Sequence, residues 1–191
     1  MRNRLARLPL ALAVVLPLSA GGAAASEAPK PKKDFAGDMV VSGKGQELVI
    51  SMRYSTALDK MRTDVKAQGM EMMGVRDMKS GEIIMWSNQM PNMAMRIQGP
   101  TDKEIDAQKT GETREIDGVA CSVWKVKEAT ACLTDDNIML ESEAEGMTAR
   151  MTNLELAPQD QSLFGPPAGV NVMDMPKNMQ GLPNFRQGLP F

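Results

Sequence analysis

The fold of this chain is decided by residues 48–67, which read LVISMRYSTALDKMRTDVKA. In the first half of this stretch Leu48, Ile50, Met52 and Tyr54 occupy every second position. After a short turn the alternation resumes with a second set: Met61, Thr63, Val65 and Ala67. Side chains of a β-strand point alternately to its two faces, so a period of two predicts two strands, each with one buried face.

Short strands of the same kind are predicted along most of the chain. Turn residues separate them, as at Asp117-Gly118, and Gly43-Lys44-Gly45 is expected to be a hairpin turn. One short helix is expected at Asp102–Gln108, because Thr101 and Glu104 have the spacing of a capping box. The further strands are expected at residues 70–75, 82–87, 93–98, 121–126, 131–135, 138–144 and 147–156. Many short strands with frequent turns indicate a mainly β domain with a mostly antiparallel sheet.

The first residues have the pattern of an export signal. Three arginines precede an apolar run, Leu8–Leu18, that is too short to span a bilayer, and the small residues Ala23–Ala25 follow it. Cleavage is therefore expected before Ser26, and the mature protein is expected to be periplasmic or secreted and soluble. The expected organisation is a signal peptide (1–25), a flexible basic leader (26–34), one curved β-sheet domain (35–172) and a mobile tail containing Pro, Gly and Met (173–191).

The chain has two cysteines, Cys121 and Cys132. In an oxidising compartment an isolated pair is most simply a disulfide, which would close a short loop and contribute about 3 kcal/mol in the chain-entropy model. The competing interpretation is a pair of free thiols that act as soft metal ligands. The compartment favours the disulfide, and the spacing alone does not decide between the two.

The composition excludes several classes of chemistry. The chain has no histidine, so catalysis by Ser-His-Asp or Cys-His sites and zinc sites built on imidazole are absent. Three of the 22 basic residues lie in the expected signal, which leaves 19 against 24 acidic residues, a net charge of −5 that disfavours binding to nucleic acid. The carboxylate pairs Asp135-Asp136 and Glu141 with Glu143 are expected on the solvated surface. We therefore predict no catalytic residues, no cofactor and no enzymatic activity.

Methionine is the unusual residue. Eight of the 18 methionines lie between Met70 and Met95. They could line an apolar concavity, where flexible thioethers adapt to varied lipids. They could instead supply soft sulfur ligands for Cu(I), for which Met90, Met93 and Met95 are the candidates. They could also be ordinary core residues that replace Leu and Phe, in line with an aromatic content of only 4%.

Three segments of the sequence carry a resemblance. They are residues 52–62 (MRYSTALDKMR), Cys121–Val126 after Asp117-Gly118, and residues 159–164 (QDQSLF) before Pro167 and Gly169. Together, over residues 35–170, they resemble an uncharacterised exported domain family related to the LolA/LolB lipoprotein-carrier superfamily. The resemblance implies a strongly curved antiparallel sheet, an incomplete barrel, with one or two short helices closing its apolar concave face. Such carriers devote more residues to capping helices than this chain offers, so a more open groove is expected.

The function predicted from these features is non-enzymatic binding of an apolar ligand, a lipid or an acylated protein, by the concave face of the sheet. The alternatives are a methionine-rich Cu(I)-binding protein and an envelope-interaction module without a small ligand. The expected partners include neither nucleic acid nor an integral membrane segment, and the protein is expected to be a monomer. The candidate lining residues are Met52, Tyr54, Met61, Val65, Met85, Met93, Met95 and Met151.

Overall fold

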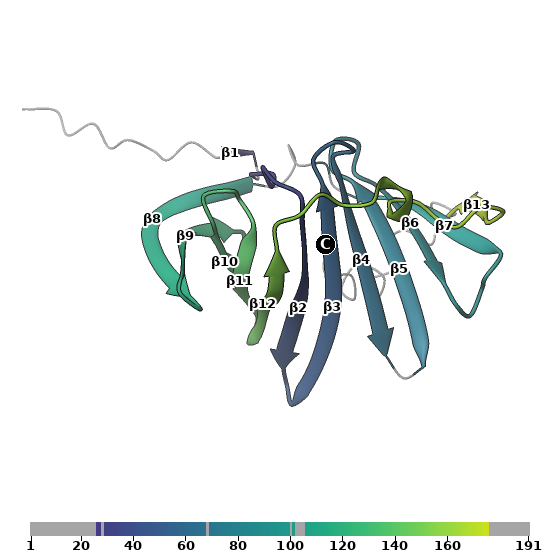
Figure 1. Cartoon of the computed structure of the whole chain (residues 1–191). Coiled ribbons are helices and arrows are strands. Elements are labelled where there is room, and N and C mark those ends of the chain that lie inside the picture. Colours follow the sequence, from purple (N-terminus) through teal and green to yellow (C-terminus); the bar gives the residue numbers. More distant parts are fainter. Residues whose placement is uncertain (1–25, 28, 68, 100, 102–105, 176–191) are drawn as a thin grey trace, which may run out of the picture.

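The computed structural model of the protein describes residues 26–27, 29–67, 69–99, 101 and 106–175. These residues form one sheet of thirteen strands that bends strongly along its width (Figure 1). The expected signal peptide and the tail beyond Met175 lie outside the described residues. In the described part, no helix is long and apolar enough to cross a membrane.

The first half of the chain supplies seven strands: β1 (Ser26–Glu27), β2 (Phe35–Gly43), β3 (Gln46–Ser55), β4 (Lys60–Ala67), β5 (Met70–Asp77), β6 (Glu82–Ser87) and β7 (Met93–Gln98). The second half supplies the others: β8 (Asp106–Ile116), β9 (Val119–Val126), β10 (Ala129–Leu133), β11 (Met139–Ala144), β12 (Met147–Glu155) and β13 (Asn171–Asp174). One turn of 3-10 helix, η2 (Gln161–Leu163), is the only helix in the described residues.

The strands lie in the order β1-β8-β9-β10-β11-β12-β2-β3-β4-β5-β6-β7-β13 across the sheet. All neighbours pair antiparallel except β13, which joins β7 in parallel. Strand β12 returns to pair with β2, so the two halves of the chain share one continuous sheet. The predicted fold class, a mainly β protein with a strongly curved antiparallel sheet and very little helix, is confirmed.

Two-residue turns at positive φ connect several of these strands. Lys44 and Gly45 have φ values of 52° and 77°, and Asp117 and Gly118 have values of 50° and 80°. Two consecutive residues in the left-handed region form the turn type whose twist matches that of a hairpin. The hairpin turns predicted at both places are confirmed.

The prediction of a helix at Asp102–Gln108 is wrong for Asp106–Gln108, which is the part of this range that the structure describes. Residues 102–105 lie outside the described part, and Asp106–Gln108 begin β8. Ala107 is buried and pairs with Val126 of β9. The long ladder between β8 and β9 satisfies the backbone of this segment, and this non-local pairing outweighs a local capping signal.

The register assigns each side chain to one of two faces of the sheet. Met39 of β2 lies opposite both Ile50 of β3 and Met151 of β12, and all three are buried in the larger apolar core. We call the face that carries these residues the inner face. A second core, on the outer face, contains Val75, Trp86 and Ala94.

The outer core is covered by the segment that follows β12. This segment passes over β3, β4 and β5 to reach η2 (Figure 1), and it brings Phe164 into the outer core. The Arg62 guanidinium of β4 donates to the carbonyl oxygen of Leu163 at 2.6 Å and lies 5.6 Å from the Trp86 ring centroid. Asp64 accepts a hydrogen bond from Arg62 as well. These contacts hold the segment on the sheet.

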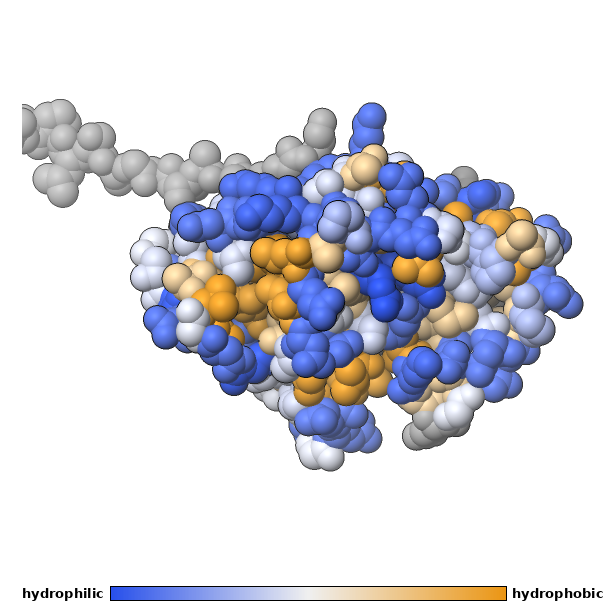
Figure 2. Space-filling view, in the orientation of Figure 1, coloured by the Kyte–Doolittle hydropathy of each residue, from blue (hydrophilic) through white to orange (hydrophobic). Residues whose placement is uncertain are grey.

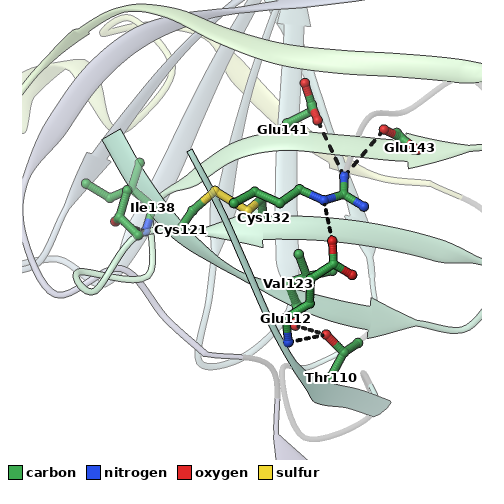
Figure 3. Close-up of a disulfide and its surroundings, with 10 residues drawn as sticks. Thr110, Glu112, Cys121, Val123, Cys132, Ile138, Glu141 and Glu143 are labelled. Atoms are coloured by element: carbon green, nitrogen blue, oxygen red, sulfur yellow. Dashed lines mark hydrogen bonds and ion pairs between the residues drawn. A yellow bond between two sulfur atoms is a disulfide. The ribbon is translucent and has the colours of Figure 1, made fainter. Parts of the chain in front are cut away.

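The two cysteines form a disulfide between β9 and β10, with Cα atoms 5.4 Å apart, which confirms the predicted pairing. Arg114 of β8 lies beside it and forms ion pairs with Glu112, Glu141 and Glu143 (Figure 3). The hydrogen bond and charge of Glu112, followed by the charges of Glu143 and Glu141, raise the pKa of Arg114. The predicted surface pair Glu141 and Glu143 is therefore part of a charge network that crosses four strands.

The start of the expected mobile tail belongs to the sheet. Met173 and Asp174 pair with β7, and Met175 is only 3% exposed, with its N–H donating to the carbonyl oxygen of Arg96. The expected boundary after Val172 therefore cuts through β13. The sequence of β13 shows no alternation of apolar and polar residues, because β13 is a short edge strand whose position depends on its pairing with β7.

A chain that ends at Val172 is expected to be less stable than one that ends at Met175. Removing the buried Met175 side chain exposes its pocket and costs about 2 kcal/mol, which corresponds to a fall of about 4–8 °C in the melting temperature of a domain of this size. Thermal unfolding followed by circular dichroism checks this result. Equal melting temperatures for the two truncated chains would show that Met173, Asp174 and Met175 contribute nothing to stability.

Candidate functional site

The inner face lines an apolar cavity of about 220 Å³ that is partly open to solvent. One wall comes from the middle of the sheet, β2 to β4 and β12, and consists of Phe35, Met39, Met52, Met61 and Met151. The opposite wall comes from β8 to β11 and consists of Ala107, Trp124, Val126, Ala131, Leu133 and Met139. The remaining lining residues are in connecting segments: Pro29, Pro31, Met78 and Asn137.

The cavity shows how the sheet is bent. Met61 of β4 and Trp124 of β9 both line it, although six steps in the strand order separate their strands. By register both residues lie on the inner face, so that face is concave here. Register also sets the two cysteines apart, because Val123 and Cys132 pair on the opposite side from Trp124 and Ala131. Both cysteines are nevertheless buried in the larger core, beside this wall.

All eight predicted lining residues lie on this inner face. Between β3 and β4, Met52 pairs with Thr63 and Tyr54 pairs with Met61. Val65 occupies the next position on the same face of β4. Gly74 of β5 connects this set to Met85, and Met85 pairs with Met95. Only three of the eight, Met52, Met61 and Met151, line the cavity itself.

The other five predicted residues are elsewhere on the same face. Tyr54 is buried, with its ring 6.2 Å from that of Phe35, and Val65 packs against the same core. Met85 is also buried. Met93 and Met95 belong to β7 and are absent from the cavity lining. Their role in ligand binding remains a prediction.

Sequence reasoning missed the whole of the second wall. On β9 the wall residues Trp124 and Val126 are two positions apart, and on β10 so are Ala131 and Leu133. Residues two positions apart lie on the same face of a strand, so selecting alternate residues of these strands would have identified them. Pro29 was missed for a different reason, because it lies in a segment expected to be a solvated leader. Nothing in a basic, proline-containing segment signals that it lies against a cavity.

The copper candidates lie in β7, next to the edge strand β13, and in the turn before β7. Met93 and Met95 share the inner face of β7, and Met90 lies in the turn before that strand. Met90 is 46% exposed and Met93 is 38% exposed. Among the described residues, no group of three or more His, Cys, Asp or Glu side chains could hold a metal ion. A methionine site for Cu(I) remains a prediction.

Charged groups surround the cavity at the ends of the strands. The Asp59 carboxylate, in the turn between β3 and β4, accepts a hydrogen bond from the Tyr54 hydroxyl (2.9 Å) and from the Lys30 ammonium (2.7 Å). The Asn137 side chain donates to the carbonyl oxygen of Lys30 at 2.8 Å. The one polar side chain of the lining therefore has its donor engaged, and the interior offers almost only apolar contacts.

The Asp34 carboxylate anchors the chain where it enters β2. Burial raises the pKa of Asp34, but hydrogen bonds from the Thr56 hydroxyl, the Thr56 N–H and the Gln159 N–H together hold it below its usual value. The ionised form is thus favoured, and it joins the start of β2 to the β3–β4 turn and to the segment after β12.

On the surface shown in Figure 2, apolar side chains gather in front of β9 to β12 and near the turns of β2 to β4, interrupted by polar side chains. The large apolar residues that are exposed are spread over distant strands, as Val49, Val119 and Met173 illustrate. The cavity is consequently the place where apolar side chains from many strands face a shared space.

Comparison with known proteins identifies the fold. Neither a protein-family model nor a curated protein sequence matches the chain. An uncharacterized conserved protein from Thermus thermophilus is similar in structure, with a TM-score of 0.55 and 11% identity over 75% of this chain and 91% of that chain. A chain of the MucA/MucB complex of Pseudomonas aeruginosa has a TM-score of 0.51 and 16% identity over 75% of this chain and 59% of that chain. At these identities the likeness shows the fold alone, and it supports the LolA-type resemblance only at that level.

Proposed function

We propose that this protein is a non-enzymatic domain of the cell envelope that holds an apolar ligand, a lipid or the acyl chain of a lipidated protein, in the inner-face cavity. The observation that carries the proposal is a space of about 220 Å³ whose lining is apolar except for Asn137. An apolar cavity of about 150 Å³ is enough to bind benzene.

The lining suits ligands of variable shape. Six of its residues are methionines, whose flexible side chains can repack around different acyl chains. The cavity has room for a section of an acyl chain, and the remainder would extend beyond it. The same lining gives no group that could act as an acid, a base or a nucleophile, which supports a binding role.

Two findings support an envelope location and a protein-borne ligand. The buried disulfide is typical of oxidising compartments. One structural neighbour comes from a complex of two proteins, MucA and MucB, so this fold is found in a protein-binding partner. An acyl chain carried by another protein would use both the cavity and its rim.

A brominated fatty acid tests the proposal, because bromine quenches tryptophan fluorescence only at contact. The chain has two tryptophans, of which Trp124 lines the cavity and Trp86 is buried in the outer core. We expect the fatty acid to quench the tryptophan fluorescence of the Trp86→Phe variant, which retains Trp124. The fluorescence of the Trp124→Phe variant should remain almost unchanged. The two variants are each other's matched control.

Equal quenching of both variants would place the fatty acid outside the cavity and contradict the proposal. Absence of quenching in the unmodified protein, with no lipid found in native mass spectra of material from the periplasm, would favour an interaction module without a small ligand.

A further inference from the structure

The segment Pro29–Lys33 crosses the cavity between its two walls. Pro29 and Pro31 both line the cavity. On one side Lys30 contacts Asp59, which lies in the turn that joins β3 and β4. On the other side Asn137, in the loop between β10 and β11, donates to the carbonyl oxygen of Lys30. We call this segment the strap.

Further contacts tie the strap to the loop between β10 and β11. The Lys32 N–H donates to the carbonyl oxygen of Asp136 (2.9 Å), and the Lys32 ammonium donates to the carbonyl oxygen of Asp135 (2.8 Å). Lys33 forms an ion pair with the Asp136 carboxylate at 2.8 Å. The basic leader expected to be solvated is therefore bonded to the domain, because the loop offers it both carboxylates and carbonyl oxygens.

These anchors are weak compared with the sheet beneath them. The Lys33–Asp136 pair is exposed, with more than half of the Lys33 side chain in contact with solvent, and the Lys30–Asp59 pair is half-buried, with a third of each side chain in contact with solvent. An exposed ion pair of this kind shifts an equilibrium by about fivefold at most. Proline has no N–H, so Pro29 and Pro31 cannot join a strand ladder. By contrast, nine residue pairs join β2 to β3 directly after the strap.

We propose that Pro29–Lys33 is a removable strap that covers part of the cavity and moves away to admit an apolar ligand while the sheet stays folded. This inference rests on the proposed function, because it names the entrance of the same site. The prolines supply an apolar underside that completes the cavity wall, and the lysines supply an outer set of contacts that water and salt can replace. Ligand exchange is therefore controlled by ionic contacts although the ligand itself is apolar.

Binding kinetics of N-phenyl-1-naphthylamine, an uncharged fluorescent probe, test the strap. The test variant carries Lys30→Ala and Lys33→Ala, which remove both ion pairs and leave the lining residues unchanged. The control is Lys66→Ala, which removes the exposed pair Lys66–Glu71 at the start of β5. We expect the association and dissociation rates of the test variant to rise together, by about three- to tenfold, with little change in Kd.

Salt should act in the same direction. Raising the ionic strength from about 0.01 M to about 1 M shortens the Debye length from about 30 Å to about 3 Å. Both rates of the unmodified protein should rise with salt, and those of the double variant should respond less. Hydrogen exchange supplies a readout without ligand: exchange in residues 29–34 should become faster in the double variant, whereas exchange in β2 should not change.

The outcomes separate the strap from the function of the cavity. If the unmodified protein binds the probe but the double variant and the Lys66→Ala control have the same rates, the strap proposal is wrong and the proposed function stands. The strap proposal would also be wrong if hydrogen exchange in residues 29–34 were as slow as in β2, both in the unmodified protein and in the double variant. If the unmodified protein binds no apolar probe, the proposed function fails, and the strap loses its role with it.

Discussion

Replacing Cys121 and Cys132 together by alanine is expected to lower the melting temperature by about 10 °C. The disulfide closes a loop with a sequence separation of 11 residues, for which the chain-entropy model gives about 3 kcal/mol. Each kcal/mol corresponds to about 2–4 °C for a domain of this size. Both sulfurs are buried in the larger core, so their loss also removes packing contacts and brings the effect to the upper part of this range.

Thermal and denaturant unfolding of the double variant measure this effect, and reduction of the unmodified protein is the matched control. Reduction should give a smaller loss than the double variant, because it breaks the same covalent constraint but leaves both buried sulfur atoms in the core. A loss below about 1 kcal/mol would show that the hairpin of β9 and β10 keeps its structure without the bond. The prediction of a stabilising disulfide would then be wrong, although the pairing itself would remain correct.

Alternation along the sequence was enough to predict most of the strands, though not β1, β2, β8 or β13, and the shared face of the eight candidate residues. The reason is geometric: a period of two carries over from strand to strand through the register of each hairpin. Tyr54 pairs with Met61, and Met85 pairs with Met95. Once the hairpin turns are known, the face on which each side chain of a strand lies follows from the faces of its neighbours on the adjacent strand.

The bend of the sheet could not be predicted from the same pattern. Curvature depends on which distant strands become neighbours, such as β12 beside β2 and β13 beside β7. Trp124 and Met61, from strands far apart in the sheet, line one cavity because of that bend. Alternation identifies a buried face, and it contains no information on whether that face is concave.

Strand β8 was missed because it lacks the pattern on which the prediction relied. Its sequence, DAQKTGETREI, is mostly polar and exposed. The register also shifts between Lys109 and Thr113, which breaks any strict period. A polar strand near the edge of the sheet is held by backbone pairing with β9, so its side chains give little sign of the strand.

Replacing Ala131 by phenylalanine is expected to weaken the binding of an apolar probe by tenfold or more. Ala131 lies on β10, in the cavity wall and half-buried. The added ring is in effect a benzene molecule tethered inside the cavity, and an apolar cavity smaller than this one accepts benzene. A tethered group competes with free ligand at an effective concentration in the millimolar range, so ligands of micromolar affinity should be displaced.

The stability of this variant distinguishes a true cavity from a packed core. If the cavity has room for the ring, Ala131→Phe should change the free energy of unfolding by less than about 1 kcal/mol, whereas the same substitution in a packed core costs about 1–3 kcal/mol. The matched control is Ala120→Phe, at an exposed position on the neighbouring strand β9, which should alter neither binding nor stability. Probe titration and denaturant unfolding measure both quantities. A stable Ala131→Phe variant that binds the probe as tightly as the unmodified protein would show that the ligand lies elsewhere, because the ring and the probe cannot share the same space.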